Sequence, residues 1–560
     1  MDSHSPSDPL VETALRHFGI PYLFPYQRLV IGNVLEAMDA HRDRAAEETE
    51  DLHDRQIVIL PTGAGKSLCF QIPARMRPGL TLVLFPLLSL MADQERRMRE
   101  AGFQPAILSG AVDAEGKRKL WERLAREPAA MLLTNPESTT SPGVRGRLRT
   151  LGVSHLVIDE AHCVTDWGES FRPAYRSLAS LIEETEPEVV TAFTATASPR
   201  IIDDLRELLF PGGAHLIRAD PDRPNITYAL LPTLSKHRSL RLLYAPHSEG
   251  VHPPVGAAPP GHPAAPSPPA TPGGGHPEPG SSANLPALGA QGPAPRPSIL
   301  FCRSRGETER AAAFLRRFLP AERCYFYHAG LSREEKKRVE EWFFASGEGV
   351  LVATCAYGMG VDKKDIKSVV HLRPASSVES YLQESGRAGR DGSPAQAALL
   401  LSPSDLEKVS PEGREAAYLT LLLSRGCQRE ALLSALGSEN ESCSGCDHCN
   451  RSAATLDVPT SAFQRRRLWP LLEGSLFTST ISGALTPSVR ESRSFLSPYW
   501  ESCGDWGEEE LKEALEEWSA FAKRLQRGEE VGEEVFPPEQ LRLKRGRGLS
   551  RGGPPRPRGS

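Results

Sequence analysis

The sequence lacks any uninterrupted apolar run of about 18 residues, the length that a transmembrane helix needs. Its first residues, MDSHSPSDPL, also lack the basic start and apolar core of a secretory signal. We therefore expect no membrane partner and a cytoplasmic location. A net positive charge is absent too: the formal net charge is −5, which excludes a uniformly basic nucleic-acid binder and leaves only local basic patches.

Cysteine is scarce, with 10 in 560 residues, and six of these are isolated in the sequence: Cys69, Cys163, Cys302, Cys324, Cys355 and Cys503. Isolated cysteines in a reducing compartment are usually small buried apolar residues. The other four form a cluster: Cys427, Cys443, Cys446 and Cys449. Four thiolates with this spacing can close a tetrahedron around Zn²⁺ and leave no open position for catalysis. Disulfide pairing is the alternative.

Short apolar runs alternate with helical stretches in two series, and the chain is long enough for three or four folding units. The first series comprises QIVIL, TLVLFP, AAMLLTNP, SHLVIDE and VVTAFTATA. The second comprises NITYALL, SILFC, RCYFYH, GVLVATC, SVVHL and AQAALLL. Such alternation predicts α/β units with parallel sheets covered on both faces. Ser332 and Glu335 predict a capping box at the start of one helix of the second unit.

A stretch inside the second series, residues 247–297, contains 15 prolines and no aromatic residue. It cannot bury enough apolar surface to offset the entropy of ordering. Because it lies between a helical stretch and the strand SILFC, we predict a disordered insert within the second unit. A linker between units is the alternative.

The alternation of strands and helices stops after Leu401. A helical stretch leads to the cysteine cluster, and GDWGEEELKEALEEW further on has helical periodicity. The last 20 residues, 541–560, hold seven basic residues and no acidic one. We predict that this end is a flexible basic tail that attracts phosphate groups.

The sequence LPTGAGKS at residues 60–67 follows the first apolar run. A glycine-rich turn between a strand and a helix offers backbone N–H groups to phosphate oxygens, and the helix dipole adds to the attraction. Lys66 would then contact the β- and γ-phosphates of ATP, and Ser67 would hold Mg²⁺. Gly63 and Gly65 are present, but Leu60 stands where the strict pattern has its first glycine.

A second motif, VIDEAH at residues 157–162, also ends a predicted strand. Asp159 is placed to hold Mg²⁺, and Glu160 is placed to polarise the attacking water. A glycine turn together with a surface acidic pair, without catalysis, is the alternative.

Two arginines, Arg387 and Arg390, lie in SYLQESGRAGRDG at residues 380–392 of the second unit. Guanidinium groups suit the planar charge of a transferring phosphoryl group. If the first unit binds ATP, these arginines reach it only across a cleft, so hydrolysis and cleft closure are coupled. The alternative is a solvated basic helix end.

From Leu23 to Cys449 the chain resembles the RecQ-type DNA helicases of helicase superfamily 2. The resemblance rests on motifs in order: FPYQ, LPTGAGKS, FPLLSLMADQ, TNPES, VIDEAHCVTDWGESFRPAY, FTATA, ILFCRSR, YHAGLS, ATCAYGMGVD and QESGRAGRDG. TDWGESFRPAY is the most specific, because it looks like the aromatic-rich loop of that family. Phe24 departs from the family, which usually has arginine at this position.

The resemblance implies roles for individual residues. Gln27 would read the adenine, and Thr194 and Thr196 would link hydrolysis to strand movement. Trp167, Phe171 and Arg172 would sense single-stranded DNA, since aromatic faces stack on bases of any sequence; that Trp167 and Phe171 are core residues is the alternative. The remaining implied contacts are those of the nucleotide loop, the acidic pair and the arginine finger: Thr62, Gly63, Gly65, Lys66, Ser67, Asp159, Glu160, Arg387 and Arg390.

The resemblance also implies a domain plan. It has two RecA-like domains, 1–215 and 216–405, a helical zinc-binding subdomain, 406–453, and the basic tail, 541–560. Residues 454–540 are either a divergent winged-helix region or a segment without that fold. The zinc ligands would be the four clustered cysteines, as in the family's four-cysteine module.

The implied function is that of an ATP-dependent DNA helicase. It would use ATP, Mg²⁺ and Zn²⁺, move 3′ to 5′ on single-stranded DNA, and unwind duplexes with a single-stranded tail in recombination and repair. Other repair or single-strand-binding proteins would be its partners. Two rivals remain: an RNA helicase of the same superfamily, and a non-motor scaffold that keeps the fold.

Overall fold

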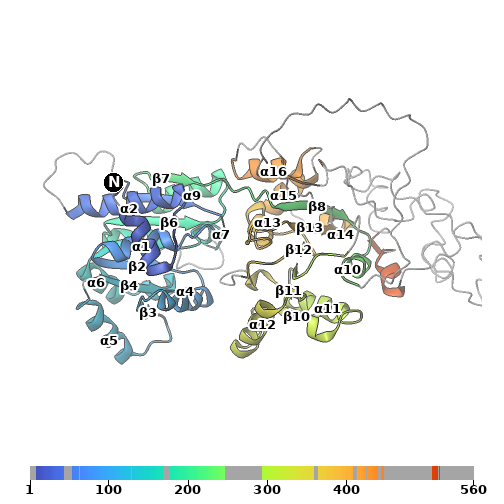
Figure 1. Cartoon of the computed structure of the whole chain (residues 1–560), viewed down its shortest axis with the longest axis horizontal. Coiled ribbons are helices and arrows are strands. Elements are labelled where there is room, and N and C mark those ends of the chain that lie inside the picture. The colour runs from blue at the N-terminus through green and yellow to red at the C-terminus, as the bar shows by residue number, and fades with distance from the viewer. Residues whose placement is uncertain are drawn as a thin grey trace, which may run out of the picture.

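Two α/β domains lie next to each other in the computed structural model (Figure 1), and residues 219–225 connect them. The structure describes residues 8–42, 53–61, 63–127, 129–167, 177–245, 293–357, 363–407, 413–423, 426–438, 443–446, 449, 507–514 and 516–517.

The first domain is built on a seven-stranded parallel sheet of order β3-β4-β2-β5-β6-β1-β7. Its strands are β1 Arg55–Ile59, β2 Gly79–Leu84, β3 Ala106–Leu108, β4 Ala129–Thr134, β5 Val153–Ile158, β6 Val189–Thr194 and β7 His215–Arg218. Sequence reasoning did not predict the two shortest, β3 and β7. Since β7 pairs with β1, the first sheet extends past residue 215, the boundary that the sequence predicts.

Helices cover both faces of this sheet. Residues at the end of β1, and Leu60 after it, alternate between two apolar clusters: Ile57 and Ile59 lie in one, Val58 and Leu60 in the other. This alternation is what a strand buried on both faces requires. The helices are α1 Pro9–Phe18, α2 Pro25–Arg42, α3 Leu68–Met76, α4 Leu88–Glu100, α5 Ala114–Leu124, η1 Pro136–Thr139, α6 Pro142–Leu151, α7 His162–Trp167, α8 Leu178–Thr185 and α9 Pro199–Leu209.

The second domain has a six-stranded parallel sheet of order β10-β11-β9-β12-β13-β8. Its strands are β8 Ile226–Pro232, β9 Ser298–Phe301, β10 Cys324–Tyr327, β11 Val350–Ala353, β12 Ser368–His371 and β13 Ala395–Leu401. Its helices are α10 Lys236–Tyr244, α11 Arg305–Leu315, η3 Ala321–Arg323, α12 Arg333–Ala345, η4 Cys355–Tyr357 and α13 Val378–Ser385. These two sheets confirm the predicted fold class of tandem RecA-like domains.

Most of the predicted insert, up to residue 292, lies outside the described residues. It falls between α10 and β9, and both of these belong to the second domain. The last residues of the predicted insert, 293–297, are part of the packed structure: Ala294 is buried and its N–H donates to the carbonyl of Leu243 at 2.7 Å.

Three short helices follow the second sheet: α14 Pro403–Glu407, α15 Arg414–Leu423 and α16 Gln428–Ala435. The cysteine cluster begins at the start of α16. Beyond it, a helical segment at residues 508–514 packs against α10, where Glu510 pairs with Arg241 and Glu513 with His237. Apart from Gly507, Glu516 and Glu517, the rest of the predicted winged-helix region and the basic tail lie outside the described residues.

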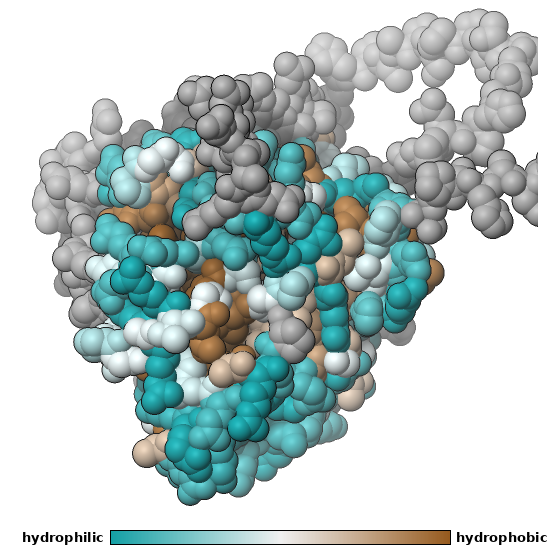
Figure 2. Space-filling view, turned by 90° about the vertical axis from the view of Figure 1, so that its left-hand side faces the viewer, coloured by the Kyte–Doolittle hydropathy of each residue, from teal (hydrophilic) through white to brown (hydrophobic). Residues whose placement is uncertain are grey.

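The outer face of the first domain is mostly hydrophilic, with apolar residues in small separate areas (Figure 2). Within the part of the chain that the structure describes, none of the helices has both the length and the apolar character needed to span a bilayer.

The capping box of α12 is confirmed: the Ser332 hydroxyl accepts from the Glu335 N–H at 3.2 Å, and the Glu335 carboxylate accepts from the Ser332 N–H at 2.8 Å. Replacing Ser332 by alanine removes the first bond, and we expect the free energy of unfolding to fall by about 1 kcal/mol. Denaturant titration measures this, with Ser332→Thr as the control that keeps the acceptor oxygen. Equal stability of the alanine variant and the wild type would contradict the prediction.

Candidate functional site

The candidate site lies at one edge of the first sheet, where strands β5, β6 and β1 end next to one another. The carboxyl ends of parallel strands share one edge, and this edge is where open α/β sheets bind ligands. Residues 60–67 follow β1, Asp159 and Glu160 follow β5, and Thr194 is the last residue of β6. Three motifs that are far apart in sequence therefore meet at one place.

The glycine-rich turn after β1 depends on two backbone conformations that favour glycine. Gly63 has φ +87° and Gly65 has φ +75°. The turn leads into α3, whose first residue is Leu68 and whose N-cap position is Ser67. The start of a helix is the positive end of its dipole, which attracts phosphate. Thr62 lies outside the described residues.

Gln27 ties α2 to this turn. Its side chain is buried; the carbonyl oxygen accepts from the Phe24 N–H at 2.9 Å, and the amide nitrogen donates to the Ala64 carbonyl at 2.9 Å. Both ends of the amide are thus occupied by protein groups. The adenine-reading role of Gln27 stays a prediction.

Lys66 and Glu160 form the central ion pair, with 3.3 Å between Nζ and Oε1. Glu160 has φ +49°, and its N–H donates to Oδ1 of Asp159 at 3.0 Å. Burial, together with the neighbouring Glu160 charge, raises the pKa of Asp159 to about 6. Burial pushes the pKa of Glu160 upward, but the charges of Lys66 and His162 outweigh it and hold that pKa below its ordinary value. Of the two carboxyls, Glu160 is therefore the one that is more readily charged.

Two polar contacts extend the site, and sequence reasoning missed one residue of each. His162 Nδ1 lies 3.0 Å from the Thr194 hydroxyl, which donates to the Thr196 carbonyl at 2.9 Å. The Ser67 hydroxyl donates to the side-chain oxygen Oε1 of Gln94 at 3.2 Å. His162 closes the motif VIDEAH and Gln94 closes FPLLSLMADQ, so the end of each motif was the available signal.

Arg387 approaches this site from the second domain. It is 4 % exposed, and burial and the neighbouring Arg390 lower its pKa to about 10, against the opposite pull of Glu384, Tyr357 and Glu160. The Arg387 charge in turn helps to lower the pKa of Glu160. The two groups therefore interact across the domain boundary. Arg387 and Arg390 lie in the turn that follows α13.

Two buried polar atoms of these groups have no hydrogen-bond partner in the described part of the chain: Oε2 of Glu160 in the first domain and Nε of Arg387 in the second. An unsatisfied acceptor and an unsatisfied donor suit a hydrated magnesium ion with its phosphates, which would supply both partners. The hydroxyl of Ser67 and the carboxylate of Asp159 are oxygen ligands of the kind that Mg²⁺ takes.

The predicted DNA-sensing residues are mostly beyond what the structure describes. Trp167 is the last residue of α7. Phe171 and Arg172 lie outside the described residues. The alternative that Trp167 and Phe171 are core residues therefore stays open.

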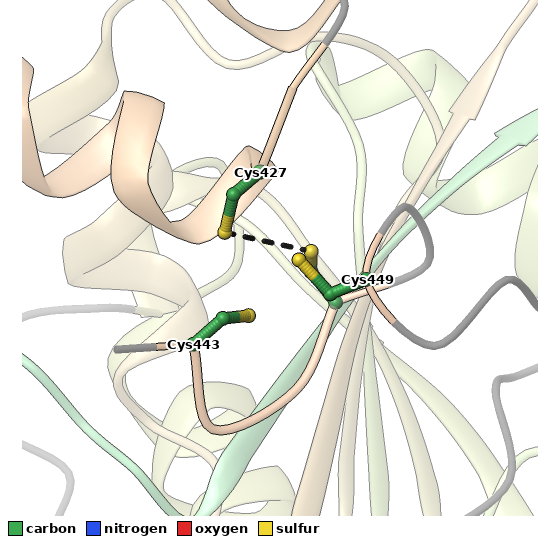
Figure 3. Close-up of side chains that lie close together, drawn as sticks. Cys427, Cys443 and Cys449 are labelled. Carbon is green, nitrogen blue, oxygen red and sulfur yellow. Dashed lines mark hydrogen bonds between the residues drawn. The ribbon is translucent and has the colours of Figure 1, made fainter. Parts of the chain in front are cut away.

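The four clustered cysteines are brought together, as the spacing predicts. Their sulfur atoms all lie within 4.8 Å of one another, and those of Cys427 and Cys446 are 3.8 Å apart. Figure 3 shows Cys427, Cys443 and Cys449 pointing toward a common space. With Zn–S bonds of about 2.3 Å, the sulfurs of a tetrahedral site lie about 3.8 Å apart, so the cluster fits Zn²⁺.

Comparison with known protein families gives two matches. Residues 24–205 match the model described as "DEAD/DEAH box helicase", and residues 289–392 match "Helicase conserved C-terminal domain". The first match contains the nucleotide-loop and acidic motifs, and the second contains the arginine pair.

Curated relatives cover more of the chain. The ATP-dependent DNA helicase RecQ of Bacillus subtilis is 30% identical over 446 residues, which are 76% of this chain and 67% of that protein. The probable ATP-dependent DNA helicase RecS of the same organism is 30% identical, over 71% of this chain and 68% of its own length. The ATP-dependent DNA helicase Q5 of Mus musculus is 30% identical over 86% of this chain and 49% of its own length. The chain spans only about half the length of several other relatives. It covers 57% of the ATP-dependent DNA helicase RecQ of Pasteurella multocida and 42% of the RecQ-like DNA helicase blm-1 of Caenorhabditis elegans.

Gly65 offers a test of how Gln27 holds the nucleotide turn. A Cβ at Gly65 would lie 2.5 Å from Nε2 of Gln27, whereas a Cβ at Gly63 would meet nothing within 4 Å. Both alanine variants force an L-residue to positive φ, which costs about 1–2 kcal/mol. We expect Gly65→Ala to lower the free energy of unfolding by more than Gly63→Ala, as measured by denaturant titration.

The same test has an internal control. In the double variant Gly65→Ala with Gln27→Ala, the Gln27 side chain is too short to meet the new Cβ. The part of the stability loss that comes from this steric contact should then disappear. If the two single glycine variants were equally stable, the Gln27 contact would not constrain the turn.

Proposed function

Because the chain belongs to the RecQ family of DNA helicases, we propose that it is an ATP-dependent enzyme that moves along single-stranded DNA and unwinds duplexes. The observation that carries this proposal is the ion pair of Lys66 with Glu160, 3.3 Å apart, which joins the glycine-rich turn after β1 to the acidic motif after β5. A nucleotide bound beside Lys66 is sensed by the second domain only if that domain supplies a group to the same cleft. The relatives named as DNA helicases support DNA as the polymer.

The proposed chemistry assigns each group one task. Lys66 neutralises the terminal phosphates, and Glu160, held charged by Lys66, orients and polarises the attacking water. Arg387 and Arg390 stabilise the charge that develops on the transferring phosphoryl group. Mg²⁺, held by Ser67 and Asp159, would screen the phosphate charge.

Coupling to DNA is proposed to pass through β6. Thr194 and Thr196 lie beside His162, so a shift of the acidic motif alters the hydrogen bond at 3.0 Å between His162 and Thr194. Trp167, Phe171 and Arg172, which follow that motif in the chain, are proposed to stack on and pair with the single strand.

The proposal also covers direction, partners and place of work. Movement is 3′ to 5′, with a role in recombination and repair alongside other repair or single-strand-binding proteins, in the cytoplasm or at the nucleoid. Phosphate contacts dominate binding, so affinity falls steeply with salt and depends little on sequence. We keep 406–453 as a zinc-binding subdomain and 454–540 as a divergent winged-helix region.

ATP hydrolysis tests the proposal directly. We expect slow hydrolysis by the protein alone, a severalfold or larger increase with single-stranded DNA, and a loss of at least about a hundredfold in Lys66→Ala, which removes the cation facing the phosphates. Phosphate release measures all three.

The control is Lys119→Ala, which changes an exposed lysine on α5 paired with Glu115 and should leave hydrolysis unchanged. Stimulation by RNA alone would favour the rival RNA helicase. A hydrolysis rate that neither DNA nor RNA changes would refute the proposed coupling.

Zinc content tests the cysteine cluster separately from activity. We expect one bound zinc per chain, held by Cys427, Cys443, Cys446 and Cys449. Cys446→Ser should lose zinc, and Cys355→Ser, at an exposed cysteine away from the cluster, should retain it. Atomic absorption of purified protein decides, and zinc retained in Cys446→Ser would contradict the assignment.

A further inference from the structure

Residues 219–225, here called the connector, do more than join the two domains. The guanidinium of Arg223 donates to three carbonyls of the turn that carries Arg387 and Arg390: Gly386 at 3.1 Å, Ala388 at 3.2 Å and Gly389 at 2.8 Å. Residues 386–391 are called the arginine loop below. Three acceptors converge on one planar fork, a geometry that lysine does not reproduce.

A second connector residue holds the same loop. The Asn225 amide nitrogen donates to the carbonyls of Gly389 and Ser393, at 2.8 Å each. Gly389 has φ +56°, and a Cβ there would lie 2.4 Å from that nitrogen. The backbone between the two arginines is therefore fixed from the connector side.

The connector is itself held by the cysteine-cluster module, α16 with its cysteines. Arg429, in the first turn of α16, is 1 % exposed and pairs with the carboxylate of Asp222. It also donates to the Arg223 carbonyl at 3.2 Å and to the Gly445 carbonyl at 3.4 Å. Gly445 lies between Cys443 and Cys446. One buried cation thus joins the cluster to the connector.

The other end of α16 contacts the first domain. Arg218, the last residue of β7, donates to the Gly437 carbonyl at 3.3 Å and to the Ala197 carbonyl at 3.4 Å. Ala197 belongs to FTATA, the motif that contains Thr194. The module therefore contacts the first domain, the connector and, through Arg223, the arginine loop.

We propose that Arg223 is a positioning residue for Arg387 and Arg390, and that the cysteine-cluster module, through Arg429, sets its place. The module then contributes to ATP hydrolysis by holding the two domains and the arginine loop in position, in addition to any surface that it offers to DNA. This inference rests on the proposed function, since it assumes that the arginines act on ATP.

Steady-state kinetics of Arg223→Lys provide the first test. The lysine keeps the charge but loses the fork, so we expect kcat for DNA-stimulated hydrolysis to fall about tenfold or more, because small displacements of a catalytic group are costly. KM for ATP and the affinity for single-stranded DNA should change less than about twofold. The matched control, Arg317→Lys, changes an exposed arginine of the same domain that pairs with Glu509 and should leave all three unchanged. Wild-type kcat in Arg223→Lys would overturn the inference.

A double-variant cycle separates positioning from general weakening. If Arg223 acts through the arginines, adding Arg223→Lys to an Arg390→Ala variant should lower kcat little further. If the two losses multiply, Arg223 acts independently of the arginine loop and the inference fails.

Hydrogen exchange of residues 386–391 provides a readout that does not depend on activity. We expect faster exchange of these residues in Arg429→Lys, with the zinc content unchanged. Asp222→Asn is the milder variant, to be used if Arg429→Lys does not fold, and we expect the same result from it. Unchanged exchange in a folded, zinc-bound variant would break the link between the module and the loop. A wild type without DNA-stimulated hydrolysis would instead refute the proposed function, while the exchange result would still decide the link.

Discussion

The common direction of strands β5, β6 and β1 is the constraint on which the candidate site depends. Because these strands are neighbours and parallel, their carboxyl ends deliver Glu160, Thr194 and the turn before Lys66 to one edge. The pair of Lys66 and Glu160, separated by 94 residues in sequence, follows from this arrangement. The pair in turn keeps Glu160 charged in a buried place, where an isolated carboxylate would be protonated.

Features of the fold that are local or periodic could mostly be predicted from the sequence. Runs such as QIVIL and AQAALLL gave strands because residues buried on both faces leave a continuous apolar pattern. The capping box at Ser332 and the meeting of the four cysteines followed from fixed spacings between residue types. In each case the physical cause lies within a few residues of the signal.

What sequence reasoning missed is long-range or too short to have a period. Strand β3 has 3 residues, and β7 has only two apolar residues, Leu216 and Ile217, between a histidine and an arginine, so neither stands out as an apolar run. The contact between Arg429 and Asp222 could not be predicted from local patterns, because Asp222 lies 207 residues earlier in the chain. Arg223 and Asn225 stand in no nucleotide motif, and their role is visible only once the arginine loop has folded against them. The bond from the Gln27 amide to the Ala64 carbonyl joins residues 37 apart in the chain, and no local pattern in the sequence signals it.

The helical segment at residues 508–514 has a practical consequence for shortened versions of the chain. Glu510 and Glu513 place carboxylates against basic side chains of α10, and Glu509 places a third against Arg317, which follows α11. A fragment that stops after the cysteine cluster removes these carboxylates, and the surface beneath them becomes more positive. Such a fragment would adsorb polyanions through a patch that the longer chain neutralises, and its apparent nucleic-acid affinity would overstate that of the longer protein.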